Sequence, residues 1–178
     1  MMYDDDDRCV PYSRPAKRDV LRELIDALNE DVTTYANLQI DAEEQGDTEQ
    51  AAEHKKKFKE VETCLALVTE RSWALHQYNR GQRHVGEPYT DAALDTWLYP
   101  TVESYYWETH EKVKRHGVEA ASATTGEQKR MYLGFRRGQF LLRAYIKSHY
   151  AYELDWERRR STPRDEDADM MPDRHEYA

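Results

Sequence analysis

Residues Ile25 to Val68 read IDALNEDVTTYANLQIDAEEQGDTEQAAEHKKKFKEVETCLALV, and this segment predicts two antiparallel helices. When it is folded between Gly46 and Asp47, apolar positions at equal distances from the fold face one another. The facing pairs are Ile25 with Val68, Leu28 with Leu65, Val32 with Val61, Tyr35 with Phe58, and Ala42 with Ala51. Apolar residues three and four apart occupy one face of a helix, and a seven-residue repeat is typical of a coiled-coil seam. The pattern therefore predicts a helical hairpin.

Turn-forming residues suggest the limits of this hairpin, which we expect over residues 16–80. Pro15 stands where helix starts favour proline. Gly46 can end the first helix in a left-handed conformation. Asp47 and Gln50, three residues apart, resemble a capping box at the start of the second helix.

A second helical hairpin is predicted over residues 90–160. Its first helix contains Pro100, where we expect a kink or break, because proline lacks an amide hydrogen and its ring pushes on the preceding turn. Gly117 is expected to end that helix. Either Thr124 or Thr125 can cap the next helix, which we expect to run to about residue 160.

Folding this second segment near residue 121 sets Tyr105 opposite Gly138 and Thr109 opposite Gly134, so that large residues face small ones. A stripe along the last helix comprises Phe135, Gly138, Leu142, Tyr145, His149, Tyr152 and Trp156. We expect the two hairpins to pack as an all-α, up-and-down four-helix bundle. Its core seam is predicted to include Leu28, Val32, Tyr35, Phe58, Val61, Leu65, Val68, Leu142 and Tyr145.

Composition agrees with one helical domain, residues 15–160, between two acidic ends. The chain has 178 residues and a formal net charge of -9, and residues 1–14 and 161–178 are rich in Asp with little to bury. We expect both ends to be flexible. Two cysteines make no disulfide framework, and Cys64 is expected to act as a small apolar filler. No signal peptide or membrane-spanning run is visible, so we expect a cytoplasmic protein.

Catalytic and metal-binding motifs are absent from the sequence. There is no nucleophile elbow, phosphate-binding loop or paired-cysteine spacing. The four-helix outline resembles ferritin-like diiron proteins, but no histidine has a glutamate three residues before it, as that family requires. His149 and Glu153, four residues apart, form one possible ligand pair. We expect His54 and His149 to be structural, and we expect no enzyme activity and no cofactor.

The last helix is unusually basic. Residues 128–160 carry nine Lys or Arg and three Asp or Glu. The candidate partner surface on this helix comprises Arg136, Arg137, Arg143, Lys147, Arg158, Arg159 and Arg160. Basic residues interleaved with Tyr and Trp can follow a nucleic-acid backbone, but cations also suit a helix C-terminus. The acidic ends of the same chain are a further candidate for screening this charge.

These observations favour a non-enzymatic helical protein that interacts with other proteins or assembles with copies of itself. A protein partner, and a homo-oligomer in particular, is the leading expectation, because a narrow core benefits from association. The first alternative is a nucleic-acid-associated protein that uses the basic helix 128–160. The second is a metal-binding, ferritin-like bundle. No membrane and no small-molecule substrate is inferred.

Overall fold

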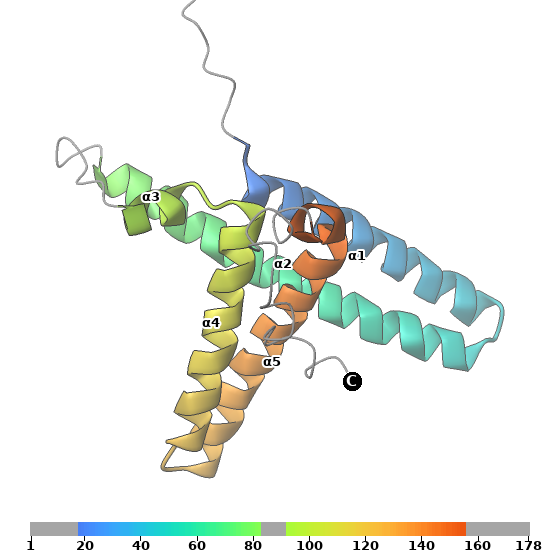
Figure 1. Ribbon diagram of the computed structural model, residues 1–178. Helices are drawn as coiled ribbons and strands as arrows, with labels where there is room; N and C mark the ends of the chain where they lie inside the picture. The colour runs from blue at the N-terminus through green and yellow to red at the C-terminus, as the bar shows by residue number, and fades with distance from the viewer. Residues whose placement is uncertain (1–17, 83–91, 156–178) are drawn as a thin grey trace, which may run out of the picture.

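The computed structural model describes residues 18–82 and 92–155, and every regular element in these ranges is a helix (Figure 1). The expected all-α class is confirmed. The helices are α1 (Val20–Glu44), α2 (Thr48–Gln82), α3 (Ala92–Leu98), α4 (Val102–Ala121) and α5 (Gly126–His149). The predicted acidic ends, residues 1–14 and 161–178, lie outside the described residues. None of the described helices has an apolar run that could cross a membrane.

Local hydrogen bonds explain where α1 ends and α2 begins. Gly46 adopts φ 72°, and the amide of Asp47 donates to the carbonyl of Ala42 at 2.9 Å. This is a Schellman ending, in which glycine takes the left-handed position at no steric cost. The carboxylate of Asp47 then accepts from the amide of Gln50 at 3.0 Å and caps α2. The turn therefore reverses the chain, and α1 packs along α2.

The start of α1 differs from the prediction. Arg18 and Asp19 are not helical, and the Asp19 carboxylate accepts from the amide of Arg22 at 3.0 Å, so α1 begins at Val20 rather than near residue 16. An aspartate in this position satisfies an amide that has no partner within the helix. Pro15 lies outside the described residues.

Pro100 separates two helices instead of kinking one. Helix α3 ends two residues before it, and Thr101 caps α4 by accepting from the amide of Ser104 at 3.0 Å. The Ser104 hydroxyl accepts in return from the amide of Thr101 at 2.8 Å, which completes a reciprocal cap. A proline cannot donate in a helix, and this cap stabilises a fresh start beyond it.

The expectation that Gly117 ends its helix is wrong. Helix α4 continues through Gly117 to Ala121, and the side chain of Arg136 lies about 3.5 Å from where a Cβ would stand on that glycine. Gly117 therefore provides space for a side chain of α5. The next helix begins as one alternative predicted, because Thr125 accepts from the amide of Gln128 at 3.1 Å.

The two hairpins cross instead of forming the expected up-and-down four-helix bundle (Figure 1). They meet mainly through α2 and α5, and their turns point in different directions. Around this crossing lies the main core, which draws buried residues from α1, α2, α4 and α5. We call residues 33–60 the α1–α2 arm and residues 112–140 the α4–α5 arm.

A physical reason for the crossing lies on α2. Gly138 of α5 packs against α2. A Cβ on this glycine would lie 3.4 Å from a methyl group of Leu67 and 3.6 Å from the methyl group of Thr63. Toward the turn, the same face of α2 continues with Glu60, Lys56 and Glu53 at helical spacing. A full-length bundle would move these charged side chains out of water and against α5, and taking charges out of water is costly.

The predicted facing of Gly138 with Tyr105 and of Gly134 with Thr109 is wrong. Gly138 faces α2, and a Cβ on Gly134 would meet nothing within 4 Å. The register differs because α4 runs four residues beyond Gly117, which moves the turn of the hairpin to residues 122–125.

The structure places the predicted seam residues at different depths. Leu28, Val61, Val68 and Leu142 are buried in the core cluster, while Val32, Tyr35, Leu65 and Tyr145 pack against it partly buried. Phe58 is half-buried nearer the turn. On the stripe predicted for the last helix, Phe135, His149 and Tyr152 are exposed, and Trp156 lies outside the described residues.

Candidate interaction surface

A buried arginine links three helices beside the crossing. Arg71 of α2 donates from Nε to Glu108 of α4 at 2.8 Å and from Nη2 to the carbonyl of Trp97 in α3 at 2.7 Å. Its guanidinium also lies over the Trp97 ring, 4.5 Å from the centroid. Charge, hydrogen bonds and packing all hold α3 and α4 to α2. These contacts give Arg71 a structural role.

Arg143 is not part of a surface, contrary to the prediction. It is 1% exposed, and its Nη1 lies 2.6 Å from Nδ1 of His110, which is 3% exposed. A guanidinium only donates, so His110 Nδ1 accepts, and a neutral His110 carries its proton on Nε2. Phe140 lies beside the guanidinium, with its ring centroid 5.1 Å away. The contact joins α4 to α5 in the core.

Two further contacts fasten the region around the end of α5 to α1. The hydroxyl of Tyr145 donates to Asp31 at 2.7 Å, and burial together with this carboxylate raises the pKa of Tyr145. Arg18 donates to both oxygens of Glu153, at 2.7 Å and 2.8 Å, and also to Glu23. Hydrogen bonding to Arg18 holds the pKa of Glu153 below its usual value.

The predicted ligand pair is not arranged around a metal. Glu153 is held by Arg18, while His149 is exposed and stacks on Tyr145 with 5.8 Å between ring centroids. In residues 18–82 and 92–155, no three His, Cys, Asp or Glu side chains are grouped so that they could hold a metal ion. His54 is half-buried and lies 6.4 Å from the Tyr35 ring.

The described residues offer little to an enzyme reaction. Burial, with Glu60 nearby, raises the pKa of Cys64 to about 12, so its thiol is protonated and weakly nucleophilic at neutral pH. A hollow near the turn of the α1–α2 arm, lined in part by Gln39, Ala51 and Lys55, is shallow and open. Catalytic sites usually combine a concave pocket with convergent titratable groups. The described surface does not show this combination.

The most unusual surface lies on the α4–α5 arm, where large apolar side chains face solvent. These are Val118, Met131, Leu133, Phe135 and Phe140, with exposed fractions between 37% and 66%. Phe135 belongs to the predicted buried stripe, yet it is exposed because α2 crosses at Gly138 and does not reach it. Its ring lies near the rings of His116 and Tyr132 on its own arm, with centroids 5.6 Å and 6.3 Å away.

These side chains occupy more than one face of α5. Leu133 and Phe140, seven residues apart, share one face, whereas Phe135 lies on the inward side with Leu142. A surface helix ordinarily has one apolar stripe, and a helix that is apolar on several sides is usually buried. In the described chain no other helix buries these apolar side chains of α5, although their distribution around the helix is typical of a buried helix.

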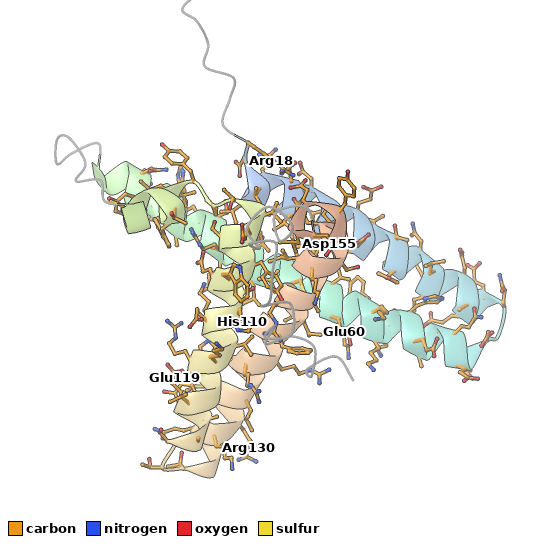
Figure 2. The ribbon with its side chains drawn as sticks, viewed as in Figure 1. Arg18, Glu60, His110, Glu119, Arg130 and Asp155 are labelled. Atoms are coloured by element: carbon orange, nitrogen blue, oxygen red, sulfur yellow. The ribbon has the colours of Figure 1, made fainter. Side chains whose placement is uncertain are left out.

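Basic side chains accompany the apolar ones. Lys129, Arg130, Arg136 and Arg137 are exposed on the same segment, and Arg130 lies near the turn of the arm (Figure 2). Two of them, Arg136 and Arg137, belong to the predicted partner surface. Lys147 of that surface is half-buried, and residues 158–160 lie outside the described part of the chain.

Sequence reasoning overlooked the apolar side chains that accompany this charge. A heptad pattern predicts one buried stripe for each helix, and Met131 and Leu133 are not part of the stripe predicted for the last helix. A signal was present, because apolar residues at 131, 133 and 135 alternate and cannot share one helix face.

Comparison with known proteins adds no assignment: no family model, curated protein or solved structure gives a significant match to this chain.

Proposed function

We propose that the protein is a non-catalytic helical interaction protein that assembles with a second copy of itself through the α4–α5 arm. The observation that carries this proposal is the exposure of Val118, Met131, Leu133, Phe135 and Phe140 on one arm. Large exposed apolar patches mark interaction sites in soluble proteins. Removing apolar surface from water is worth about 25 cal/mol for each Å² buried.

The composition of the arm also suits an interface. Arginine and aromatic side chains are enriched at interface centres, where they combine apolar area with directional hydrogen bonds. Arg137 lies within one turn of both Leu133 and Phe140 on α5, so the two kinds of group lie close together. A partner that buries the ring of Phe140 can also bind the guanidinium of Arg137.

Sedimentation velocity over a range of protein concentrations tests this function. We expect a reversible dimer, and we expect Leu133→Ser with Phe140→Ser to weaken it by about tenfold or more, because buried anchors dominate interface energetics. The matched control is Trp73→Ser, which removes an exposed apolar side chain from α2, outside both arms. A wild-type chain that stays monomeric up to about 1 mM would contradict self-assembly.

A second candidate function is binding of single-stranded nucleic acid by the same segment. Exposed Phe135 and Phe140 stand among exposed Arg130, Arg136 and Arg137, and such surfaces can combine base stacking with phosphate contacts. Arg143 is removed from this set by its burial. A gel-shift titration at two salt concentrations tests it, because phosphate contacts require a steep loss of affinity as salt rises.

A further inference from the structure

The two arms carry opposite charges. Helix α1 has seven Asp or Glu and one Arg, with Asp41, Glu43 and Glu44 in its last turn and no basic residue there. Helix α5 has six Lys or Arg and one Glu, with Lys129 and Arg130 close to its N-terminus.

These charges are unfavourable for the helices that carry them. A helix has a partial negative charge at its C-terminus and a partial positive charge at its N-terminus. Acidic residues at the end of α1 and basic residues near the start of α5 therefore each repel their own helix end. A contact that brought the two ends together would relieve both repulsions at once.

The charges also lack ion-pair partners within the described chain. Among the ion pairs of residues 18–82 and 92–155, none involves Asp41 or Glu44 of α1, or Arg130 or Arg137 of α5. Exposed apolar side chains adjoin both sets. Ile40 and Leu38 adjoin the acidic group, and Leu133 adjoins the basic one.

We infer that the basic N-terminal half of α5 docks on the acidic C-terminal half of α1 in a second copy of this chain. The contact pairs Arg130 and Arg137 with Asp41 and Glu44, around the apolar side chains beside them. Two such contacts related by a two-fold axis close a dimer, the commonest symmetry of soluble assemblies. This inference rests on the proposed self-association and specifies its surfaces.

The contact lies between molecules because the arms diverge within one. In Figure 1 the turn of the α1–α2 arm and the turn of the α4–α5 arm lie on different sides of the crossing. The contacts of Tyr145 with Asp31 and of Arg71 with Glu108 join the two hairpins at the crossing. One molecule therefore presents both complementary surfaces to others.

Charge reversal tests the inference without weakening either helix. The α5 variant combines Arg130→Glu with Arg137→Glu, and the α1 variant combines Asp41→Lys with Glu44→Lys. At Arg130, Asp41 and Glu44 the new charge suits the nearby end of the helix, so we expect thermal stability to be retained or increased. Sedimentation velocity should show each variant dimerising about tenfold more weakly or worse, because like charges then face each other.

Mixing the two reversed variants is the decisive measurement. An acidic α5 from one variant then meets a basic α1 from the other, and the reverse pair is equally complementary. We expect an equimolar mixture to form a heterodimer at concentrations where each variant alone is mostly monomeric. The matched control is Glu62→Lys with Glu70→Lys, which makes the same charge change at exposed positions of α2 outside these surfaces and should leave the dimer intact.

The remaining outcomes separate this inference from the proposed function. A wild-type dimer that survives both reversals, or a mixture that stays monomeric, overturns the α5–α1 contact and leaves self-association standing. A monomeric wild type overturns both. If that monomer binds a single-stranded oligonucleotide and the α5 variant does not, the basic half of α5 binds nucleic acid and not a second copy of the chain.

Discussion

The α1–α2 arm and the α4–α5 arm are both antiparallel helical pairs, but they differ in what they show to water. Near its turn the α1–α2 arm closes on small residues, with Ala42 and Ala51 buried, and its outer faces are mostly charged, with Leu38 and Ile40 as exposed apolar side chains. The α4–α5 arm buries Val113 and Ala120, yet keeps Leu133 and Phe135 outside. One supersecondary structure therefore supports two different surfaces. The position of the apolar residues around each helix decides whether the two helices of an arm can bury them against each other.

The largest expected effect is a difference in unfolding free energy between two substitutions on α1, one at the crossing and one on the α1–α2 arm. Leu28 is fully buried at the crossing, whereas Leu38 is 38% exposed on the arm. We expect Leu28→Ala to lower the free energy of unfolding by about 2–5 kcal/mol, because it leaves a cavity. Leu38→Ala should change it by about 0.5 kcal/mol or less. Urea denaturation of both variants checks this contrast, and equal losses would place the core elsewhere.

The next effect concerns the polar contact that joins α4 to α5 at the base of their arm. Removing His110 takes a hydrogen-bond acceptor from the buried guanidinium of Arg143. We expect His110→Ala to cost about 3 kcal/mol, because a buried charge then loses a partner.

A double-mutant cycle shows whether this cost belongs to the pair. Combining His110→Leu with Arg143→Met replaces both polar groups by apolar ones and should recover much of the loss, as it does for other buried polar pairs. Simple addition of the two single effects in denaturant unfolding would show that the contact carries no coupling energy.

Gly138 and Gly134 allow a smaller, sharper test of the crossing. A Cβ on Gly138 would meet Leu67 of α2 at 3.4 Å, while Gly134, one turn away, faces open space. We expect Gly138→Leu to cost about 1–3 kcal/mol by overpacking. Gly134→Leu should stabilise α5 by about 0.5–1 kcal/mol through helix propensity. Thermal melts that shift equally for both variants would mean that α2 does not cross α5 at Gly138.

The sequence predicted what local periodicity and turn chemistry determine. The α1–α2 turn follows from Gly46 and Asp47, whose conformational and hydrogen-bonding preferences act within a few residues. The break at Pro100 was one of two anticipated outcomes, for the same local reason.

The crossing and its polar contacts were not predictable in this way. Arg71 and Glu108 are 37 residues apart, and Arg143 and His110 are 33 residues apart, so no periodic pattern links them. A heptad repeat indicates which face of a helix is apolar, but not how far along that face another helix extends. For that reason Phe135 was assigned to a covered stripe, although it lies in the uncovered candidate surface.

The smallest expected effect tests whether one contact helps hold α1 to the chain beyond α5. Arg18 pairs with Glu153, and both side chains are more than a third exposed, so we expect Glu153→Gln to cost only about 0.2–1 kcal/mol at pH 7. Because the pKa of Glu153 is lowered from 4.5 in the folded chain, the contribution is present above that value and fades as pH falls through the folded pKa. Urea unfolding from pH 7 down to pH 3 should show wild type and variant converging. A difference that stays constant over this range would mean that the carboxylate of Glu153 does not fasten the two hairpins together.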